Sequence, residues 1–167
     1  MFLTVLDVSI SGLLMGGIYA LIAMGLSIQY GVARVLNVSH GEFIMFGAFC
    51  TWWLHAVLGL NPFLAMIISG PVIFACGYGL HRTLFTSLRK SSENMGAYEG
   101  ISLLASFGLM FIVQNVALLI WGADPQGYTF MAQPASIFGA IFTANRLMAL
   151  VFAATISLVF YLFLIHT

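Results

Sequence analysis

The sequence predicts an all-α integral membrane protein, a polytopic bundle of about five transmembrane helices with an interrupted segment near residues 31–41. Of the 167 residues, 62% are hydrophobic and only 6% are charged, whereas soluble domains carry about 25% charged residues. Residues 8–33 contain no Asp, Glu, Lys, Arg or His, and a bilayer-spanning helix needs about 20 predominantly apolar residues. The net charge of zero gives no electrostatic indication of a nucleic-acid partner.

Five predominantly apolar runs are each long enough to cross a bilayer at about 1.5 Å of rise per residue. Between the third and fourth runs, residues 81–99 are polar and predict a cytoplasmic loop, whereas residues 124–145 predict an extracytoplasmic segment of extended character. The predicted spans comprise residues 9–30, 40–57, 62–80, 100–121 and 147–165.

Small residues recur every four positions along the first span, at Gly12, Gly16 and Ala20. Residues at this spacing share one helix face, and small side chains let another helix approach closely in lipid. We therefore expect this face to pack against a helix, rather than to contact a transported solute.

The interruption between the first two spans carries several polar groups. Ser39 and Glu42 have the S-x-x-E spacing of a capping box, in which the hydroxyl bonds the N3 amide and the carboxylate bonds the N-cap amide. This spacing predicts a helix that begins at His40. Asn37 adds a side chain that can bond backbone groups, and Gly41 permits close approach.

The distribution of basic residues predicts the orientation of the chain. With the amino terminus outside, five spans place Arg34, Arg82, Arg89 and Lys90 on the cytoplasmic side, and only Arg146 on the other. Short cytoplasmic loops carry an excess of Lys and Arg, which favours this arrangement.

Motifs for catalysis and metal binding are missing from the sequence. It has no GxxxxGK[ST] phosphate loop and no HExxH, and His40 and Glu42 lack the i, i+4 spacing of two ligands on one helix face. We expect no metal, no cofactor and no catalytic residue, with any ATP hydrolysis taking place in partner subunits. An interrupted helix can instead hold a small polar solute near the middle of the bilayer, although an ordinary capped loop at the membrane surface fits the same residues.

The first two spans resemble the membrane permease subunits of branched-chain amino acid importers of the ABC class, together with the related urea and short-amide permeases. In that family a small-rich helix ends in Ala-x-Gly-Leu and is followed by Tyr-Gly, an Asn-x-x-His-Gly turn, an acidic residue and an apolar Gly-Ala helix. The matching residues are Ala23, Gly25, Leu26, Tyr30, Gly31, Asn37, His40, Gly41, Glu42, Gly47 and Ala48. Weaker agreement continues through residues 106–122 and the start of the fifth span.

The resemblance implies a second permease subunit, cytoplasmic ATPase subunits and an extracytoplasmic solute-binding protein, all acting at a bacterial inner membrane. Val38 and Ser39 stand where Phe-Ala is commoner, which could alter the turn. Such permeases continue beyond the position of Thr167 into a cytoplasmic loop that contacts the ATPase. The sequence therefore predicts the amino-terminal half of a permease.

The function predicted from these observations is import of branched-chain amino acids or a related small solute. Asn37, Ser39, His40, Gly41 and Glu42 are the residues expected in the solute path or in a hinge beside it. The alternatives are a permease for urea or short amides, a passive small-solute channel, and a membrane fragment that only binds other subunits.

Overall fold

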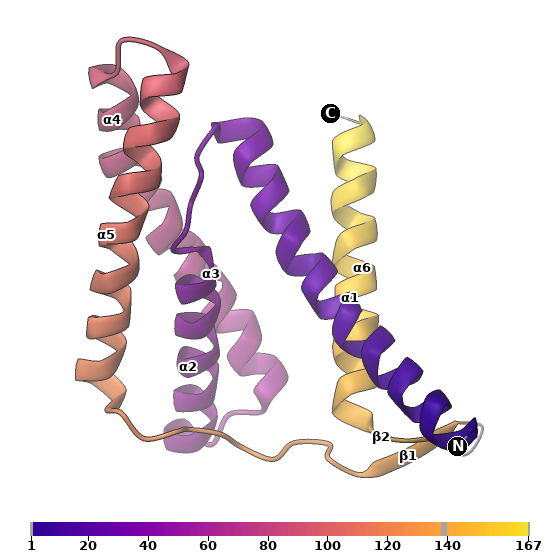
Figure 1. Ribbon diagram of the computed structural model, residues 1–167. Helices are drawn as coiled ribbons and strands as arrows, with labels where there is room; N and C mark the ends of the chain where they lie inside the picture. Colours follow the sequence, from indigo (N-terminus) through magenta and orange to yellow (C-terminus); the bar gives the residue numbers. More distant parts are fainter. Residues whose placement is uncertain (1, 138–139, 167) are drawn as a thin grey trace. The chain divides into compact units, whose positions relative to one another are not determined.

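The computed structural model describes residues 2–137 and 140–166, and the chain divides into two compact units. One unit comprises Met1–Ile28 and Thr129–Thr167, and the other comprises Gln29–Tyr128. The placement of the two units relative to one another is not determined (Figure 1).

Within the described residues, five helices are long and apolar enough to cross a membrane, which confirms the predicted fold class. The helical stretches that meet this criterion are Thr4–Ala33, His40–Leu58, Pro62–Ser91, Met95–Trp121 and Ala144–His166. Large apolar side chains are exposed along them, for example Val32, Phe74 and Leu119 at 76%, 74% and 85%. Such extensive apolar surface indicates contact with lipid or with other membrane helices.

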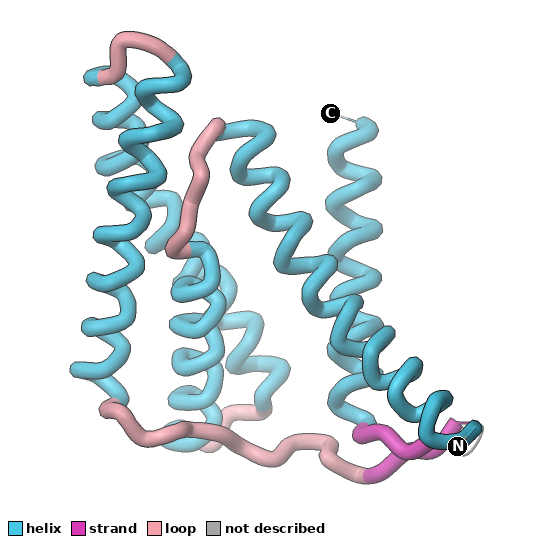
Figure 2. The backbone as a smooth tube through the Cα atoms, viewed as in Figure 1, coloured by secondary structure: helices cyan, strands magenta, loops and turns pink. Residues whose placement is uncertain are grey.

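Helix α1 spans Phe2–Ala33 and helix α2 spans His40–Leu58, so the chain is interrupted between them (Figure 2). Helix α2 begins at the expected residue, His40. It ends at Leu58, and the next residue, Gly59, adopts a left-handed conformation with φ of 66°.

Helix α3 spans Pro62–Leu80 and begins with a local capping arrangement. The Asn61 side chain accepts a hydrogen bond from the Phe63 N–H at 3.0 Å, and Pro62 occupies the first turn, where its missing N–H costs nothing. The helix continues through Pro71 without interruption.

The expectation that residues 81–99 form a loop is largely wrong. A π-helical turn η1, His81–Phe85, and helix α4, Thr86–Ser91, continue α3, and helix α5, Met95–Trp121, begins after a short turn. The residues of this stretch are polar, which predicts a loop, but polar residues are also compatible with a helix beyond the end of an apolar run. Asn94 caps the start of α5, because its side chain accepts a hydrogen bond from the Ala97 N–H at 2.8 Å.

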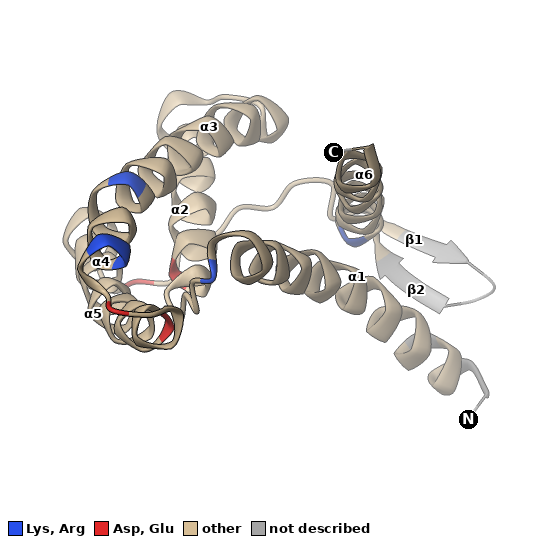
Figure 3. Cartoon of the chain, turned by 90° about the horizontal axis from the view of Figure 1, so that it is seen from above, with Lys and Arg blue, Asp and Glu red and all other residues tan. Residues whose placement is uncertain are grey.

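Within the Gln29–Tyr128 unit, α2 packs against α3 and α5, and α4 packs against α5. Basic residues lie on the α3–α4 stretch, and acidic residues lie near α4 and α5 (Figure 3). A small buried cluster of Val35, Phe85 and Tyr98 joins the interruption to η1 and α5.

In the other unit, strands β1, Pro134–Ile137, and β2, Ala140–Thr143, form an antiparallel hairpin that leads into helix α6, Ala144–His166. The extended character predicted for residues 124–145 is present as this hairpin and the irregular stretch before it.

The predicted packing face of α1 makes no close contact within the described chain. A Cβ added at Gly12 or Gly16 would meet nothing within 4 Å, and Ala20 is exposed. The neighbouring Gly17 makes the close contact instead, because a Cβ there would clash with Leu150 of α6. A partner helix for the face formed by Gly12, Gly16 and Ala20 remains a prediction.

Candidate solute site at the interruption between α1 and α2

Helix α1 ends at an unusual backbone conformation. Arg34 has φ of 54°, which is rare for a residue with a side chain, and its N–H donates to the Tyr30 carbonyl at 2.9 Å. The Arg34 guanidinium lies 5.7 Å from the centre of the Tyr30 ring, a distance at which a cation is attracted to the ring face. The chain then runs in a non-helical conformation until His40.

The hydrogen bonds around Ser39 overturn the predicted capping box. The Ser39 hydroxyl makes no cap bond and donates to Asn37 Oδ1 at 2.5 Å, and the same oxygen accepts from the Ser39 N–H at 3.1 Å. The Asn37 side chain thus forms an Asx turn with the N–H of the residue two positions later. The physical reason is that both backbone N–H groups of the box have other acceptors: the Glu42 N–H donates to the Ser39 carbonyl at 3.0 Å, and the Ser39 N–H donates to Asn37 Oδ1.

The second member of the predicted box, Glu42, is bonded to another helix. Glu42 Oε1 accepts a hydrogen bond from Gln114 Nε2 of α5 at 2.8 Å. An unpaired amide within an apolar membrane helix is costly, so this bond satisfies the Gln114 side chain. The sequence did not indicate that Glu42 would be its partner.

Ser106 of α5 forms hydrogen bonds with the backbone of the interruption. Its hydroxyl oxygen accepts from the Val38 N–H at 3.1 Å, and its proton can be donated to the Leu36 carbonyl at 3.1 Å or to the Leu103 carbonyl at 2.7 Å. Ser106 is fully buried. One side chain therefore satisfies backbone groups that the missing helical turn leaves without helical partners.

The contacts of α2 with α5 show where α2 begins along its neighbour. Val38 meets Ser106, Glu42 meets Gln114, and Phe46 packs edge-on against Trp121 with ring centres 5.0 Å apart. The two helices thus run parallel. At about 1.5 Å per residue, Ser106 lies about 16 Å from the start of α5 and about 22 Å from its end. The interruption therefore reaches the middle of a membrane-length helix.

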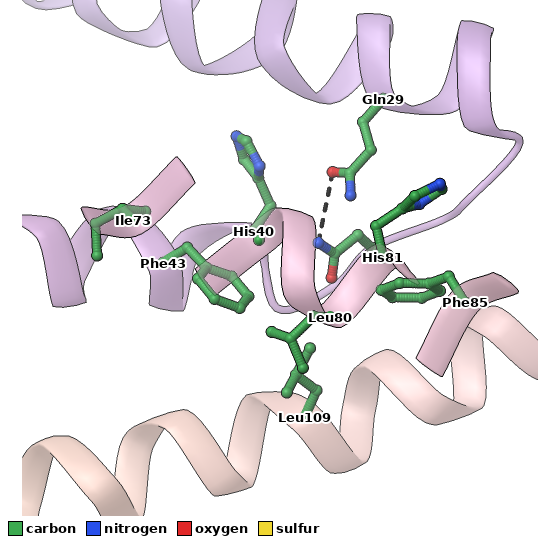
Figure 4. Close-up of a pocket in the computed structure, with 10 residues that line it drawn as sticks. Gln29, His40, Phe43, Ile73, Leu80, His81, Phe85 and Leu109 are labelled. Carbon is green, nitrogen blue, oxygen red and sulfur yellow. Dashed lines mark hydrogen bonds between the residues drawn. The ribbon is translucent and has the colours of Figure 1, made fainter. Parts of the chain in front are cut away.

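A cavity of about 240 Å³ lies beside the interruption (Figure 4). Ligand pockets of drug size occupy about 300–1,000 Å³, so this cavity suits a smaller solute. No Asp, Glu, Lys or Arg lines it. Its lining residues are Gln29, Asn37, His40, Phe43, Ile73, Gly77, Leu80, His81, Phe85 and Leu109.

The polar lining comes from three helical segments and from the interruption itself. Gln29 of α1 accepts from Asn37 Nδ2 at 3.5 Å, and the imidazoles of His40 and His81 lie on either side of this amide pair in the view of Figure 4. Neither imidazole has a hydrogen-bonding partner among the residues that the structure describes. These rings and the long amide–amide bond leave donors and acceptors available to a polar solute.

The structure separates the five predicted site residues into groups. Asn37 and His40 line the cavity, whereas Ser39 and Glu42 are bonded to Asn37 and α5 outside the lining. Gly41 is exposed, and a Cβ there would meet nothing within 4 Å.

Sequence reasoning missed Gln29, His81 and Phe85 as lining residues. Gln29 is a polar residue in an uncharged run, a signal that was available in the sequence. His81 and Phe85 depend on the π-helical turn, which no sequence pattern indicated. Within the described residues, no group of three His, Cys, Asp or Glu side chains could hold a metal ion.

These features define a multi-pass membrane protein with an interrupted helix and a small cavity beside it, in which four polar side chains stand among apolar ones. The sequence pattern of the family described as branched-chain amino acid transport system, permease component, matches residues 8–167. The chain belongs to this permease family, as its first two spans suggested.

Curated relatives agree with this assignment. The chain is 32% identical over 118 residues to the high-affinity branched-chain amino acid transport system permease protein BraD of Pseudomonas aeruginosa, covering 66% of this chain and 36% of the relative. It is 28% identical over 130 residues to the LivH permease proteins of Salmonella typhimurium and Escherichia coli, covering 73% of this chain and 40% of each relative. The chain thus matches less than half the length of these relatives. No solved structure matches it significantly.

Proposed function

We propose that this chain forms part of the membrane pathway of an ABC importer that carries branched-chain amino acids or a closely related small solute. The observation that carries the proposal is the polar cavity beside the interruption, in a chain of this permease family. The relatives named above are permease proteins of branched-chain amino acid systems, which favours amino acids over urea or short amides.

Asn37 and His40 contact the solute in this proposal. Ser39 and Glu42 hold them in place: Ser39 bonds the Asn37 oxygen, and Glu42 fixes the first turn of α2 to α5. The positive end of the α2 dipole points to the same region and favours a solute carboxylate.

The proposed assembly contains a second permease subunit, cytoplasmic ATPase subunits and an extracytoplasmic solute-binding protein. It lies in a bacterial inner membrane with the amino terminus outside. That orientation places Arg82, Arg89 and Lys90 of η1 and α4 on the cytoplasmic side, in accord with the excess of basic residues there.

Uptake of radiolabelled leucine, isoleucine and valine by the assembled transporter tests the proposal. We expect ATP-dependent uptake that falls strongly in Asn37→Ala and His40→Ala, with protein levels in the membrane unchanged. Gly41→Ala is the matched control for a small change at the same turn, and it should retain most of the uptake because a Cβ fits there.

Two results would overturn parts of the proposal. Solute flux in vesicles without any ATPase subunit would indicate a passive channel. Uptake of urea or acetamide with none of leucine would keep the permease assignment but replace the substrate class.

A further inference from the structure

A second cavity of about 270 Å³ lies next to the first in the Gln29–Tyr128 unit. The residues that line it are Val32, Ala33, His81, Phe85, Thr86, Arg89 and Tyr98. Two side chains, His81 and Phe85, line both cavities. Both belong to η1, at its first and last positions.

The π-helical turn is held by identified hydrogen bonds. The Thr86 N–H donates to the His81 carbonyl five residues earlier, and the Thr86 hydroxyl donates to the same carbonyl at 2.9 Å. The Thr83 hydroxyl donates to the Gly79 carbonyl at 2.8 Å. Single π turns inside helices are frequent at functional sites, because the extra residue changes the direction of the side chains around it.

Phe85 is the buried member of the shared pair. It is 4% exposed and packs with Val35 of the interruption and Tyr98 of α5. His81 is exposed, and its imidazole has no hydrogen-bonding partner among the described residues. An apolar ring and a polar ring therefore stand together where the two cavities meet.

The two cavities differ in charge. The first contains no Asp, Glu, Lys or Arg, whereas the second contains Arg89, whose guanidinium lies 5.6 Å from the centre of the Tyr98 ring. A solute that passes from the first cavity to the second would move from a lining without Lys or Arg towards the Arg89 guanidinium.

We propose that the two cavities are successive compartments of one solute path, with Phe85 as the barrier between them and His81 as the polar side chain that contacts the solute on both sides. This inference rests on the proposed transport function and adds two residues and a barrier to it. The presence of Arg89 in the second compartment identifies the solute class as one that carries a carboxylate.

Accessibility to a membrane-impermeant, negatively charged methanethiosulfonate tests the barrier independently of transport. The two free cysteines, Cys50 and Cys76, are first replaced by alanine in the assembled transporter. Gly77→Cys then reports on the first compartment, since a Cβ at Gly77 meets nothing within 4 Å, and Ala33→Cys reports on the second. The reagent is applied separately to each face of membrane vesicles.

We expect Gly77→Cys to be labelled slowly from the face that labels Ala33→Cys while Phe85 is present. Phe85→Ala should raise that rate several-fold. The series Phe85→Leu, Phe85→Val and Phe85→Ala should raise it progressively, so the test holds even where the alanine variant fails to reach the membrane. Phe74→Ala is the matched control, because Phe74 lies on α3, is 74% exposed and lines neither cavity.

An unchanged Gly77→Cys labelling rate across the Phe85 series would overturn the inference, even where wild-type leucine uptake persists and the proposed function stands. Conversely, a barrier that opens in a transporter that takes up no amino acid would retain the two-compartment geometry and refute the proposed function. Arg89→Gln separates the solute classes: weaker uptake of leucine with unchanged uptake of a neutral amide is expected, and equal loss of both would refute the carboxylate assignment.

Discussion

The two connections at the ends of α2 are built in opposite ways. The connection after α2 is local: Gly59 supplies the left-handed residue, Asn61 caps the next helix, and Pro62 starts it. The connection before α2 depends on distant residues, since Ser106 and Gln114 of α5 bond the interruption and the first turn of α2.

The difference shows why one connection is structural and the other is a candidate site. Residues 59–61 satisfy their own backbone within a few positions, so nothing else is required to form the turn. The interruption is satisfied by another helix and adjoins a cavity that separate helices line. A solute that alters the position of α5 would therefore affect the interruption and leave the other connection unchanged.

The largest expected effect is a loss of stability on removing the Ser106 hydroxyl, which bonds the interruption but not the connection after α2. Ser106→Ala leaves the Val38 N–H without this acceptor, and the net loss of one hydrogen bond costs about 0.5–1.5 kcal/mol. Ser102→Ala is the matched control: Ser102 is equally buried on the same helix, but its hydroxyl donates only to the Glu99 carbonyl of α5. Thermal unfolding in detergent should show a lower midpoint for Ser106→Ala than for Ser102→Ala. Equal decreases in the two midpoints would mean that the Ser106–Val38 bond does not stabilise the interruption.

The bond from Gln114 to Glu42 should show energetic coupling between α2 and α5. In a double-mutant cycle of Glu42→Ala and Gln114→Leu, each of which removes one partner of the bond, we expect an interaction free energy of about 1 kcal/mol, because the two groups are in direct contact. Asn115→Leu replaces Gln114→Leu in the control cycle, since Asn115 bonds the Phe111 carbonyl of its own helix. An additive first cycle would mean that this bond does not hold the first turn of α2.

Removing the cap at the local connection should reduce stability without affecting transport. Asn61→Ala removes the acceptor for the Phe63 N–H and should cost about 1 kcal/mol. Leucine uptake per folded transporter should stay at the wild-type level, because residue 61 lies far along the chain from the cavity lining. If uptake falls while the folded fraction is unchanged, the distinction drawn between the two connections is wrong.

The smallest effects are expected at Arg34, where backbone strain and a cation–aromatic contact oppose each other. Arg34→Ala loses the contact with Tyr30 but keeps the left-handed backbone, whereas Arg34→Gly loses the contact and relieves the strain. We expect the glycine variant to be more stable than the alanine variant by about 1 kcal/mol. Equal unfolding midpoints for the two variants would show that φ at this position is not strained.

The apolar runs, the start of α2 at His40 and the Asn61–Pro62 start of α3 could all be predicted, because each depends on residues close together in the sequence. The capping box could not be judged in this way. The spacing of Ser39 and Glu42 was correct for it, but Asn37 and Gln114 offered both side chains other partners. The continuation of α3 to Ser91 was also missed, because polarity was taken as the end of the helix when it marked only the end of the apolar layer.

The sequence by itself determined that this is a multi-pass membrane protein of the permease family and that its first two spans are separated by a polar interruption. Only the tertiary structure decided what the interruption contacts. It placed Ser106 against Val38 midway along α5 and brought Gln29, Asn37, His40 and His81 to one cavity. The physical reason is that hydrophobicity and helix-start signals act over a few residues, whereas a hydrogen bond between helices depends on their register, which packing along their whole length sets.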